Sequence, residues 1–339
     1  MSDRRLPVYL LLDCSESMAG PAIEAVARGV DSLVGTLRGN PQALETAYLS
    51  VITFAREARQ VVPLTELLRF QAPRLTVRTG TALGAALRLL PECLRREVVK
   101  STPTTKGDYK PLVFLLTDGQ PTDDWEPAAA ALRAANSPRI ANIYAIGCGP
   151  DVDTDVLRQV TDIVLTMPDL NPDAFRKFFV WLSASVQSAS VKLHSGPGEA
   201  PIDMPPLPPG ALEVAPISSG EYDPTPRQVF LHARCRETKK PYLMRFGLRP
   251  YDGRYEAIAA HPLDEIEPGD GDLLPPINSA MLDGCPSCPY CSHTVAAMCP
   301  CGSLFCAGPG EKGEVVCPSC NAHLTDGGGG PVDIRRSTG

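Results

Sequence analysis

The 339-residue sequence lacks the features that attach a protein to a membrane or to nucleic acid. No run of about 18 uncharged apolar residues occurs, and the N-terminus (MSDRRLPV) has no long apolar region of a signal peptide. Asp and Glu outnumber Lys and Arg by 39 to 32, which gives a net charge of −7. A general nucleic-acid surface needs clustered excess positive charge. We therefore expect a cytoplasmic protein with no membrane contact, and the charge argues against nucleic acid as a partner.

The residue patterns of common hydrolases are also absent. The sequence contains no G-x-S-x-G, no H-E-x-x-H and no phosphate-binding Gly-rich loop with Lys. Cys14 lies beside Asp13, but no His occurs in the first 190 residues to activate it as a nucleophile. We therefore expect a protein that is not an enzyme and has no catalytic residues.

Residues 1–194 alternate apolar strands with amphipathic helices. The predicted strands are 8–13, 47–55, 58–64, 111–118, 140–148 and 162–167. The predicted helices are 21–38, 82–98, 126–136, 154–160 and 172–193. Such alternation with short connections predicts an α/β fold with a doubly wound, mainly parallel sheet and helices on both faces. The close spacing of strands 47–55 and 58–64 predicts a hairpin that adds an antiparallel edge strand.

The composition changes after this first domain. Residues 195–226 contain nine Pro and four Gly, which indicates a semi-rigid linker. Residues 227–325 form a β-rich region that ends in a small zinc-ribbon-like, Cys-rich metal-binding part at 283–323. The Gly-rich tail 326–339 is expected to be disordered.

Polar side chains follow the first apolar strand at every second position. Asp13, Ser15 and Ser17 lie in the turn between the strand of residues 8–13 and the helix of residues 21–38. Open α/β sheets bind ligands at the edge where the carboxyl ends of their strands meet. An Asp or Ser at such a junction also commonly caps the helix that follows, so the turn alone is weak evidence for a site.

Other segments should reach the same edge. RTGTALGAAL (78–87) is a polar loop that enters a helix, LLTDGQPTDD (115–124) is a strand that ends in Asp118, and IYAIGCGP (143–150) ends in a Gly-rich turn. Two carboxylates and three hydroxyls would then converge. This is a hard-oxygen set suited to Mg²⁺ or Mn²⁺.

Asp-x-Ser-x-Ser after the first apolar strand, Thr-Ala-Leu-Gly at the opening of a helix and Thr-Asp-Gly after a later strand resemble the metal-ion-dependent adhesion site of a von Willebrand factor type A domain. The resemblance spans about 190 residues and implies that the cation is held by Asp13, Ser15, Ser17, Thr81 and Asp118. Thr81 fits the family's threonine best because Leu87 then occupies the apolar position six residues later; Thr79 is the alternative. The site would bind an Asp or Glu of a partner protein. A haloacid-dehalogenase-type phosphatase is excluded because it requires a second Asp where this chain has Ser15.

Eight of the 12 cysteines lie between Cys285 and Cys320, a density that indicates metal binding in a chain without a secretory signal. Two C-P-x-C turns, Cys288–Cys291 and Cys317–Cys320, predict one closed, structural Cys₄ zinc site. The remaining thiols predict a second zinc site, formed by Cys285, Cys299, Cys301 and Cys306. This pairing stays open: Cys285 could share a turn with Cys288, and His293 or His323 could replace one thiol. No His-x-Glu of a zinc deaminase occurs.

The whole arrangement resembles the TerY-like group of bacterial tellurite-resistance proteins. DCSESMAGPAIEAV, ETAYLSVITFA and LLTDGQPTDDW carry the resemblance, together with the Cys-rich C-terminal region. It implies a non-catalytic scaffold that operates with a Ser/Thr kinase and a metal-dependent phosphatase. The alternative is a nucleic-acid-associated subunit, which combines the same two domain types. The charge disfavours it, because the segment from Cys285 to Cys320 contains only Glu311, Lys312 and Glu314 as charged residues.

Overall fold

The computed structural model describes residues 4–102, 104, 106–134, 140, 142–149, 152–195, 204–215, 226, 228–249, 251–266, 274–308, 315–324 and 330–337. The chain divides into two compact units. The N-terminal unit comprises Met1–Thr76 and Thr81–Gly220, and the C-terminal unit comprises Val77–Gly80 and Glu221–Gly339. Among the described residues, every helix is too short or too polar to span a bilayer.

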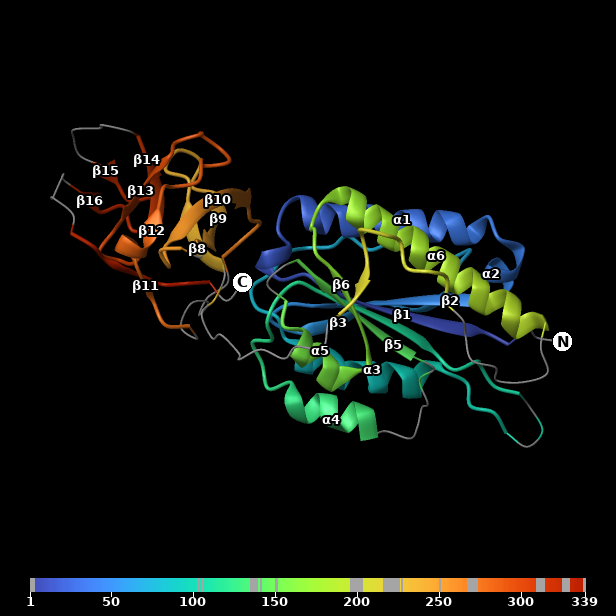
Figure 1. Ribbon diagram of the computed structural model, residues 1–339. Helices are drawn as coiled ribbons and strands as arrows, with labels where there is room; N and C mark the ends of the chain where they lie inside the picture. Colours follow the sequence, from blue (N-terminus) through green and yellow to red (C-terminus); the bar gives the residue numbers. More distant parts are fainter. Residues whose placement is uncertain are drawn as a thin grey trace. The chain divides into compact units, whose positions relative to one another are not determined.

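A seven-stranded sheet with the order β3-β2-β1-β4-β5-β6-β7 forms the centre of the N-terminal unit (Figure 1). The strands are β1 (Leu6–Asp13), β2 (Ala47–Phe54), β3 (Ala58–Glu66), β4 (Leu112–Thr117), β5 (Asn142–Cys148), β6 (Ile163–Met167) and β7 (Glu213–Val214). The five central strands are parallel, whereas β3 and β7 pair antiparallel at the two edges. The predicted mainly parallel sheet and the predicted hairpin of β2 and β3 are confirmed.

Helices cover both faces of this sheet because its strands are apolar on both sides. Successive side chains of a strand point to opposite faces. Leu10 and Leu12 of β1 therefore lie in one core, and Tyr9 and Leu11 lie in the other. The helices are α1 (Pro21–Arg38), α2 (Pro41–Thr46), α3 (Leu83–Glu97), α4 (Glu126–Ala134), α5 (Thr154–Val160) and α6 (Pro172–Ser195). Figure 1 shows α1, α2 and α6 on one face and α3, α4 and α5 on the other.

The helix predicted over 21–38 coincides with α1, and the other four predicted helices are present. Helix α2 was not predicted, because its six residues are too few to show a helical period. Its start is nevertheless visible in the sequence: the Asn40 side chain accepts a hydrogen bond from the Ala43 N–H, and Pro41 occupies the first turn.

Helices α1 and α6 pack closely at one glycine. A Cβ atom at Gly29 would lie 2.0 Å from Cδ2 of the Phe179 ring. Because Phe179 is buried in the core on this face, the ring has little room to move. Gly29 therefore lets α6 approach α1, and this contact holds the helical layer on the sheet.

Part of the predicted linker belongs to the N-terminal unit. Within 195–226, residues 204–215 lie against the sheet and α6: Leu212 is buried in the core, and the Trp181 indole N–H donates to the Pro205 carbonyl at 3.1 Å. Strand β7 extends the sheet next to β6. The prediction of a spacer is wrong for residues 204–215; most of the rest of the segment lies outside the described residues.

The C-terminal unit contains a six-stranded sheet with the order β12-β10-β9-β8-β14-β13. Its strands are β8 (Gln228–Arg234), β9 (Pro241–Leu248), β10 (Tyr255–Pro262), β12 (Leu282–Asp283), β13 (Val295–Met298) and β14 (Leu304–Ala307). Strand β8 pairs antiparallel with β9, and β9 pairs antiparallel with β10, in agreement with the predicted β-rich region. Two small pairs complete the unit: β11 (Ile277–Asn278) with β17 (Asp333–Ile334), and β15 (Val315–Val316) with β16 (His323–Leu324).

The described part of the C-terminal tail is folded. In residues 330–337, β17 pairs with β11, Ile334 is buried in the core, and the Ser337 N–H donates to the Phe230 carbonyl at 2.8 Å. The prediction of a disordered tail over 326–339 is therefore wrong for 330–337, whereas 326–329, 338 and 339 lie outside the described residues. The sequence signal was weak, since only the short stretch around Val332 and Ile334 is apolar after the glycine run.

Candidate metal centres

Two aspartates meet at the carboxyl edge of the N-terminal sheet. Asp13 is the last residue of β1, and Asp118 directly follows β4, the parallel neighbour of β1. Both side chains are buried, as are Ser15 and Ser17 in the turn that follows β1. The register of the two strands therefore brings residues 105 positions apart in sequence to one place, as the sequence analysis expected.

A chain of short contacts links these side chains. The Ser15 N–H donates to Asp13 Oδ1 at 2.8 Å, and the Ser15 and Ser17 hydroxyl oxygens are 2.8 Å apart. The Ser17 hydroxyl then donates to Asp118 Oδ1 at 2.6 Å. The structure thus brings four of the predicted ligands into one cluster. Their role as metal ligands stays a prediction.

Thr81 reaches the same cluster from the start of α3. A Cβ atom placed on Gly119 would lie 3.1 Å from Thr81 Oγ1 and 3.5 Å from Ser17 Oγ, so these two oxygens face the same backbone position. The alternative residue, Thr79, is also buried, 4% exposed against 1% for Thr81. The contacts at Gly119 favour Thr81, because its hydroxyl lies beside that of Ser17.

Two residues that the sequence analysis did not single out as ligands hold the Thr81 loop in place. The Thr122 hydroxyl accepts from the Thr81 N–H at 2.9 Å, and the Thr122 N–H donates to the Thr81 carbonyl at 3.0 Å. The Asp123 carboxylate accepts from the N–H groups of Gly84 and Ala85 and so caps α3. The loop after Asp118 therefore fixes the position of the Thr81 loop. Asp123 lies 39 residues after Gly84 in the sequence, so local sequence could not reveal this cap.

Burial makes the acidic cluster electrostatically costly. Burial raises the pKa of Asp13 to about 6, although hydrogen bonds from Ser15 and Thr117 act in the opposite direction. Among the described residues, no cationic side chain pairs with Asp13. A divalent cation would offset this cost, and a set of carboxylate and hydroxyl oxygens fits the hard cations Mg²⁺ and Mn²⁺.

The thiols near this edge are not suited to nucleophilic chemistry. Burial raises the pKa of Cys14 and of Cys148, and the carboxylate of Asp13 adds to both shifts. A thiol with a raised pKa stays protonated at neutral pH, and the thiolate is the nucleophile. The oxygens at the edge can therefore bind a cation, but neither thiol beside them supplies a reactive group.

In the C-terminal unit, eight sulfur atoms form two compact groups. The first consists of Cys235, Cys288, Cys291 and Cys306, and the second of Cys299, Cys301, Cys317 and Cys320. Within each group the sulfur atoms lie within 4.8 Å of one another, which suits four thiolates around one tetrahedral Zn²⁺. In the first group Cys291 Sγ is 3.3 Å from Cys306 Sγ; in the second, Cys299 Sγ is 3.6 Å from Cys320 Sγ.

The predicted pairing of the cysteines is therefore corrected. The two C-P-x-C turns belong to different groups, and Cys285 belongs to neither. Cys235 takes its place, because the parallel pairing of β8 with β14 brings the end of β8 beside Cys306. Sequence reasoning missed Cys235, which lies 50 residues before the cluster; its position directly after a predicted strand was the available signal.

The two histidines considered as replacements differ in position. His293 Nδ1 is 3.3 Å from Cys291 Sγ and forms a further close group with Cys291 and Glu237, whereas His323 is in no ligand group among the described residues.

In each cysteine group one thiol is readily deprotonated. Burial raises the pKa of Cys235 and of Cys317, but hydrogen bonds to the sulfur outweigh it and lower each pKa to about 7.

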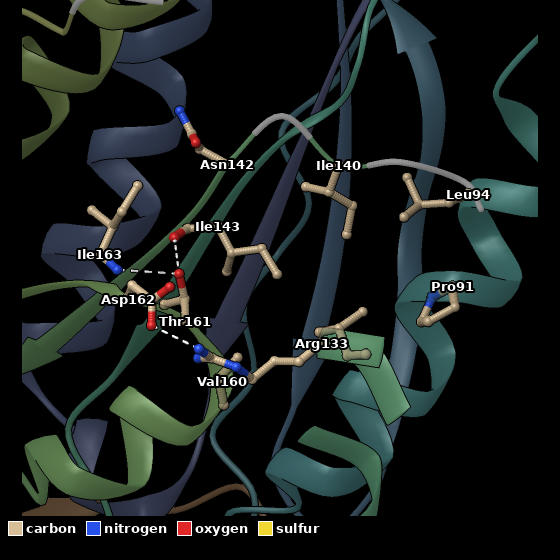
Figure 2. Close-up of a pocket in the computed structure, with 11 residues that line it drawn as sticks. Pro91, Leu94, Arg133, Ile140, Asn142, Ile143, Val160, Thr161, Asp162 and Ile163 are labelled. Atoms are coloured by element: carbon tan, nitrogen blue, oxygen red, sulfur yellow. Dashed lines mark hydrogen bonds and ion pairs between the residues drawn. The ribbon is translucent and has the colours of Figure 1, made fainter. Parts of the chain in front are cut away.

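A cavity of about 380 Å³ lies at the opposite edge of the N-terminal sheet. Figure 2 shows its polar groups contacting one another: Arg133 pairs with Asp162 at 2.7 Å, and the Thr161 hydroxyl donates to the Ile143 carbonyl at 2.8 Å. It is lined by Asn142 and Ile163, the first residues of β5 and β6, so it lies at the amino ends of the strands. This cavity is therefore separate from the acidic cluster.

Comparisons with known proteins agree with this division into two units. Residues 8–171 match the family model of the von Willebrand factor type A domain, and residues 226–339 match the TerY-C metal binding domain. No curated protein matches the sequence.

Several solved structures resemble the fold of the N-terminal part. Proximal thread matrix protein 1 from the mussel byssus is 17% identical with a TM-score of 0.40, over 55% of this chain and 48% of that one. The pilus adhesin SpaC from Lactobacillus rhamnosus GG, in its open conformation, is 15% identical with a TM-score of 0.45, over 56% of this chain and 31% of that one. The conserved hypothetical protein BatB from Bacteroides thetaiotaomicron is 18% identical with a TM-score of 0.38, over 54% of this chain and 99% of that one. The chain thus spans less than half the length of the first two.

Proposed function

Because the chain combines a von Willebrand factor type A domain with a TerY-C metal binding domain, we propose that it is a metal-dependent protein-interaction scaffold and not an enzyme. The observation that carries the proposal is the cluster of oxygen donors at the carboxyl edge of the N-terminal sheet. In it, buried carboxylates and hydroxyls converge, and the neighbouring thiols of Cys14 and Cys148 have raised pKa values. Such a set can bind a cation and a ligand of that cation, and in this proposal both carboxylates are occupied as ligands of the cation instead of acting as bases.

The cation is Mg²⁺ or Mn²⁺ in this proposal. Its ligands are Asp13, Ser15, Ser17, Thr81 and Asp118. These oxygens leave room in an octahedral shell for an outside ligand, since Mg²⁺ normally keeps several waters. A partner's Asp or Glu would displace one such water. The hydroxyls matter here because, being neutral, they leave the cation with more unbalanced positive charge than an all-carboxylate set would.

Residues near this edge would form the rim of the interface. Gln120, Asp124 and Trp125 follow Asp118 in the same loop. Trp125 is partly buried against the core beneath α3 and α4, and part of its ring stays accessible to a partner. Aromatic side chains of this kind commonly anchor interfaces around a central polar contact.

The two cysteine groups have a structural role in this proposal. Four thiolates close the coordination shell of Zn²⁺, so no position remains for a substrate. The core of the C-terminal unit is small, and two zinc ions would supply the stability that its apolar contacts lack. Reduced, zinc-bound cysteines also favour a cytoplasmic location.

We further propose that the scaffold operates in a bacterial tellurite-resistance or stress phospho-signalling system. The partners would be a Ser/Thr kinase and a metal-dependent phosphatase. The support is the resemblance to the TerY-like group and the match of residues 226–339 to the TerY-C metal binding domain.

The test is capture of partner proteins by the zinc-loaded full chain, with Mg²⁺ and with a chelator of Mg²⁺. We expect a protein kinase or phosphatase to be retained only with Mg²⁺ and to be lost with Asp118→Ala. Asp31→Ala, an exposed carboxylate on α1, is the matched control and should keep the partner. If the partner is retained equally with and without Mg²⁺, and equally by the Asp118→Ala variant, the proposed role of the carboxyl edge is overturned. If the chain shows phosphatase or nuclease turnover that is lost with Asp13→Ala, the proposal that it is not an enzyme is overturned.

A further inference from the structure

The C-terminal unit contains a second cavity, of about 430 Å³, that the function proposed above does not use. Four segments and the single residue Ile266 line it; the segments are the end of β8, the turns at residues 301–304 and 319–320, and the C-terminal segment 334–337. The last of these is held in place by its pairing with β11 and by the Ser337 N–H bond to Phe230. The walls are therefore built from fixed backbone.

Positive charge is concentrated in this cavity. Arg234, Arg335 and Arg336 line it, and no Asp or Glu is among its described lining residues. This contrasts with the chain as a whole, whose net charge is −7. Guanidinium groups stay protonated at any physiological pH, so the cavity holds fixed positive charge.

Arg336 carries this charge in a half-buried position. Its Nε is buried and has no hydrogen-bond partner among the described residues, and burial lowers the pKa of the guanidinium. The Arg234 guanidinium donates to the Lys239 carbonyl at 3.3 Å, and no carboxylate of the described residues pairs with it. A buried charge without a counter-charge is costly, and an anion bound in the cavity would offset that cost.

Two serine hydroxyl groups line the same cavity as the arginines. The hydroxyl oxygens of Ser303 and Ser319 are 2.8 Å apart and bridge the two turns that line the cavity. A carboxylate would occupy the fork of one guanidinium, whereas a phosphoryl group presents oxygens in several directions and can engage several guanidinium and hydroxyl groups together. From this juxtaposition we propose that the cavity is a binding site for a phosphoryl group, either free phosphate or a phosphorylated side chain.

Another role for the arginines has to be distinguished. Cys301 and Cys320 also line the cavity, and four thiolates around one Zn²⁺ carry excess negative charge. Arginines that served only to balance that charge would strengthen zinc binding and bind no added anion. The proposal is independent of the acidic cluster in the N-terminal unit, so the two can fail separately.

The experiment uses the zinc-loaded full chain and isothermal titration with three probes: inorganic phosphate, a phosphoserine peptide, and the same peptide without phosphate. We expect saturable binding of a phosphorylated probe, none of the unphosphorylated peptide, and a loss of at least tenfold in affinity with Arg336→Ala. Tighter binding of the peptide than of phosphate identifies a phosphorylated partner, and equal affinity identifies the free anion.

Controls keep the result decisive. Arg69→Ala, an exposed arginine of the N-terminal unit, should bind as the wild type does. Zinc content and near-UV circular dichroism establish that Arg336→Ala is folded, and Arg234→Ala replaces it if it is not. The proposal is overturned if neither phosphorylated probe binds to the wild type, or if folded, zinc-loaded Arg336→Ala and Arg234→Ala both bind as the wild type does.

Discussion

Replacing Cys235 with Ser should release one of two zinc ions, whereas replacing Cys285 with Ser should release none. Cys235 is fully buried in a group with Cys288, Cys291 and Cys306, and Cys285 lies outside both groups. A structural zinc site is worth about 10–16 kcal/mol of apparent binding free energy. Divided evenly over four thiolates, each ligand contributes roughly 2.5–4 kcal/mol, so its loss should lower zinc affinity by about two to three orders of magnitude.

The assay is titration of the protein with a chromogenic zinc chelator of known affinity, with total metal measured separately. Wild type and Cys285→Ser should both hold two zinc ions against the chelator, and Cys235→Ser should hold one. The two pairings of the cysteines differ most at these two positions. If Cys285→Ser lost a zinc ion while Cys235→Ser kept both, the pairing inferred from sequence spacing would be right and the arrangement in the structure would be refuted.

Three further predictions concern packing, pH and the cation site. Gly29→Ala should destabilise the chain by about 1–3 kcal/mol, because its Cβ would overlap the Phe179 ring. Gly35→Ala lies on the same helix but has open space around its Cβ, so it should stabilise the chain by roughly 0.8 kcal/mol. Urea unfolding measures both changes, and equal effects would contradict the close contact between the helices. Burial lowers the pKa of His261 in the folded chain below its usual value near 6.5, so at pH 5 to 7 the unfolded chain binds more protons than the folded chain, and the free energy of unfolding should fall as pH drops from 7 to 5. His261→Gln should make the free energy of unfolding depend less on pH, and an unchanged pH dependence would argue against this role of His261. Gly119→Ala should weaken Mn²⁺ binding about tenfold without changing any charge, because its Cβ would lie only 3.1 Å from Thr81 Oγ1, one of the proposed ligand oxygens; calorimetry with unchanged affinity would count against the placement of Thr81.

The oxygen cluster was within reach of sequence reasoning because its residues lie at the carboxyl ends of strands or in the turns that lead from strands into helices. Asp13 follows an apolar run and Asp118 follows another, and parallel strands bring their carboxyl ends to one edge. No long-range detail was needed beyond that rule. The preference for Thr81 over Thr79 came from the family resemblance, through the position of Leu87, and the short distance from Thr81 Oγ1 to a Cβ placed on Gly119 agrees with it.

The cysteine groups were less accessible because spacing reveals turns but not which turns share a metal. That choice depends on the pairing of β8 with β14, which brings Cys235 to Cys306 across 71 positions of sequence. The tail was misjudged for a related reason. Its glycine run suggested disorder, but a few residues beyond it pair with β11, and this pairing places Arg336 in the cavity.

The most direct test of the account is calorimetric titration of Mn²⁺ into the zinc-loaded full chain. Mn²⁺ prefers oxygen ligands, so the cysteine groups should not compete for it. The account predicts one Mn²⁺ site in the wild type and in Asp31→Ala, and no measurable site in Asp118→Ala, with all three proteins folded and equal in zinc content. Mn²⁺ binding of the same affinity in Asp118→Ala, or none in the wild type, would contradict the claim that the carboxyl edge of the N-terminal sheet is a cation site.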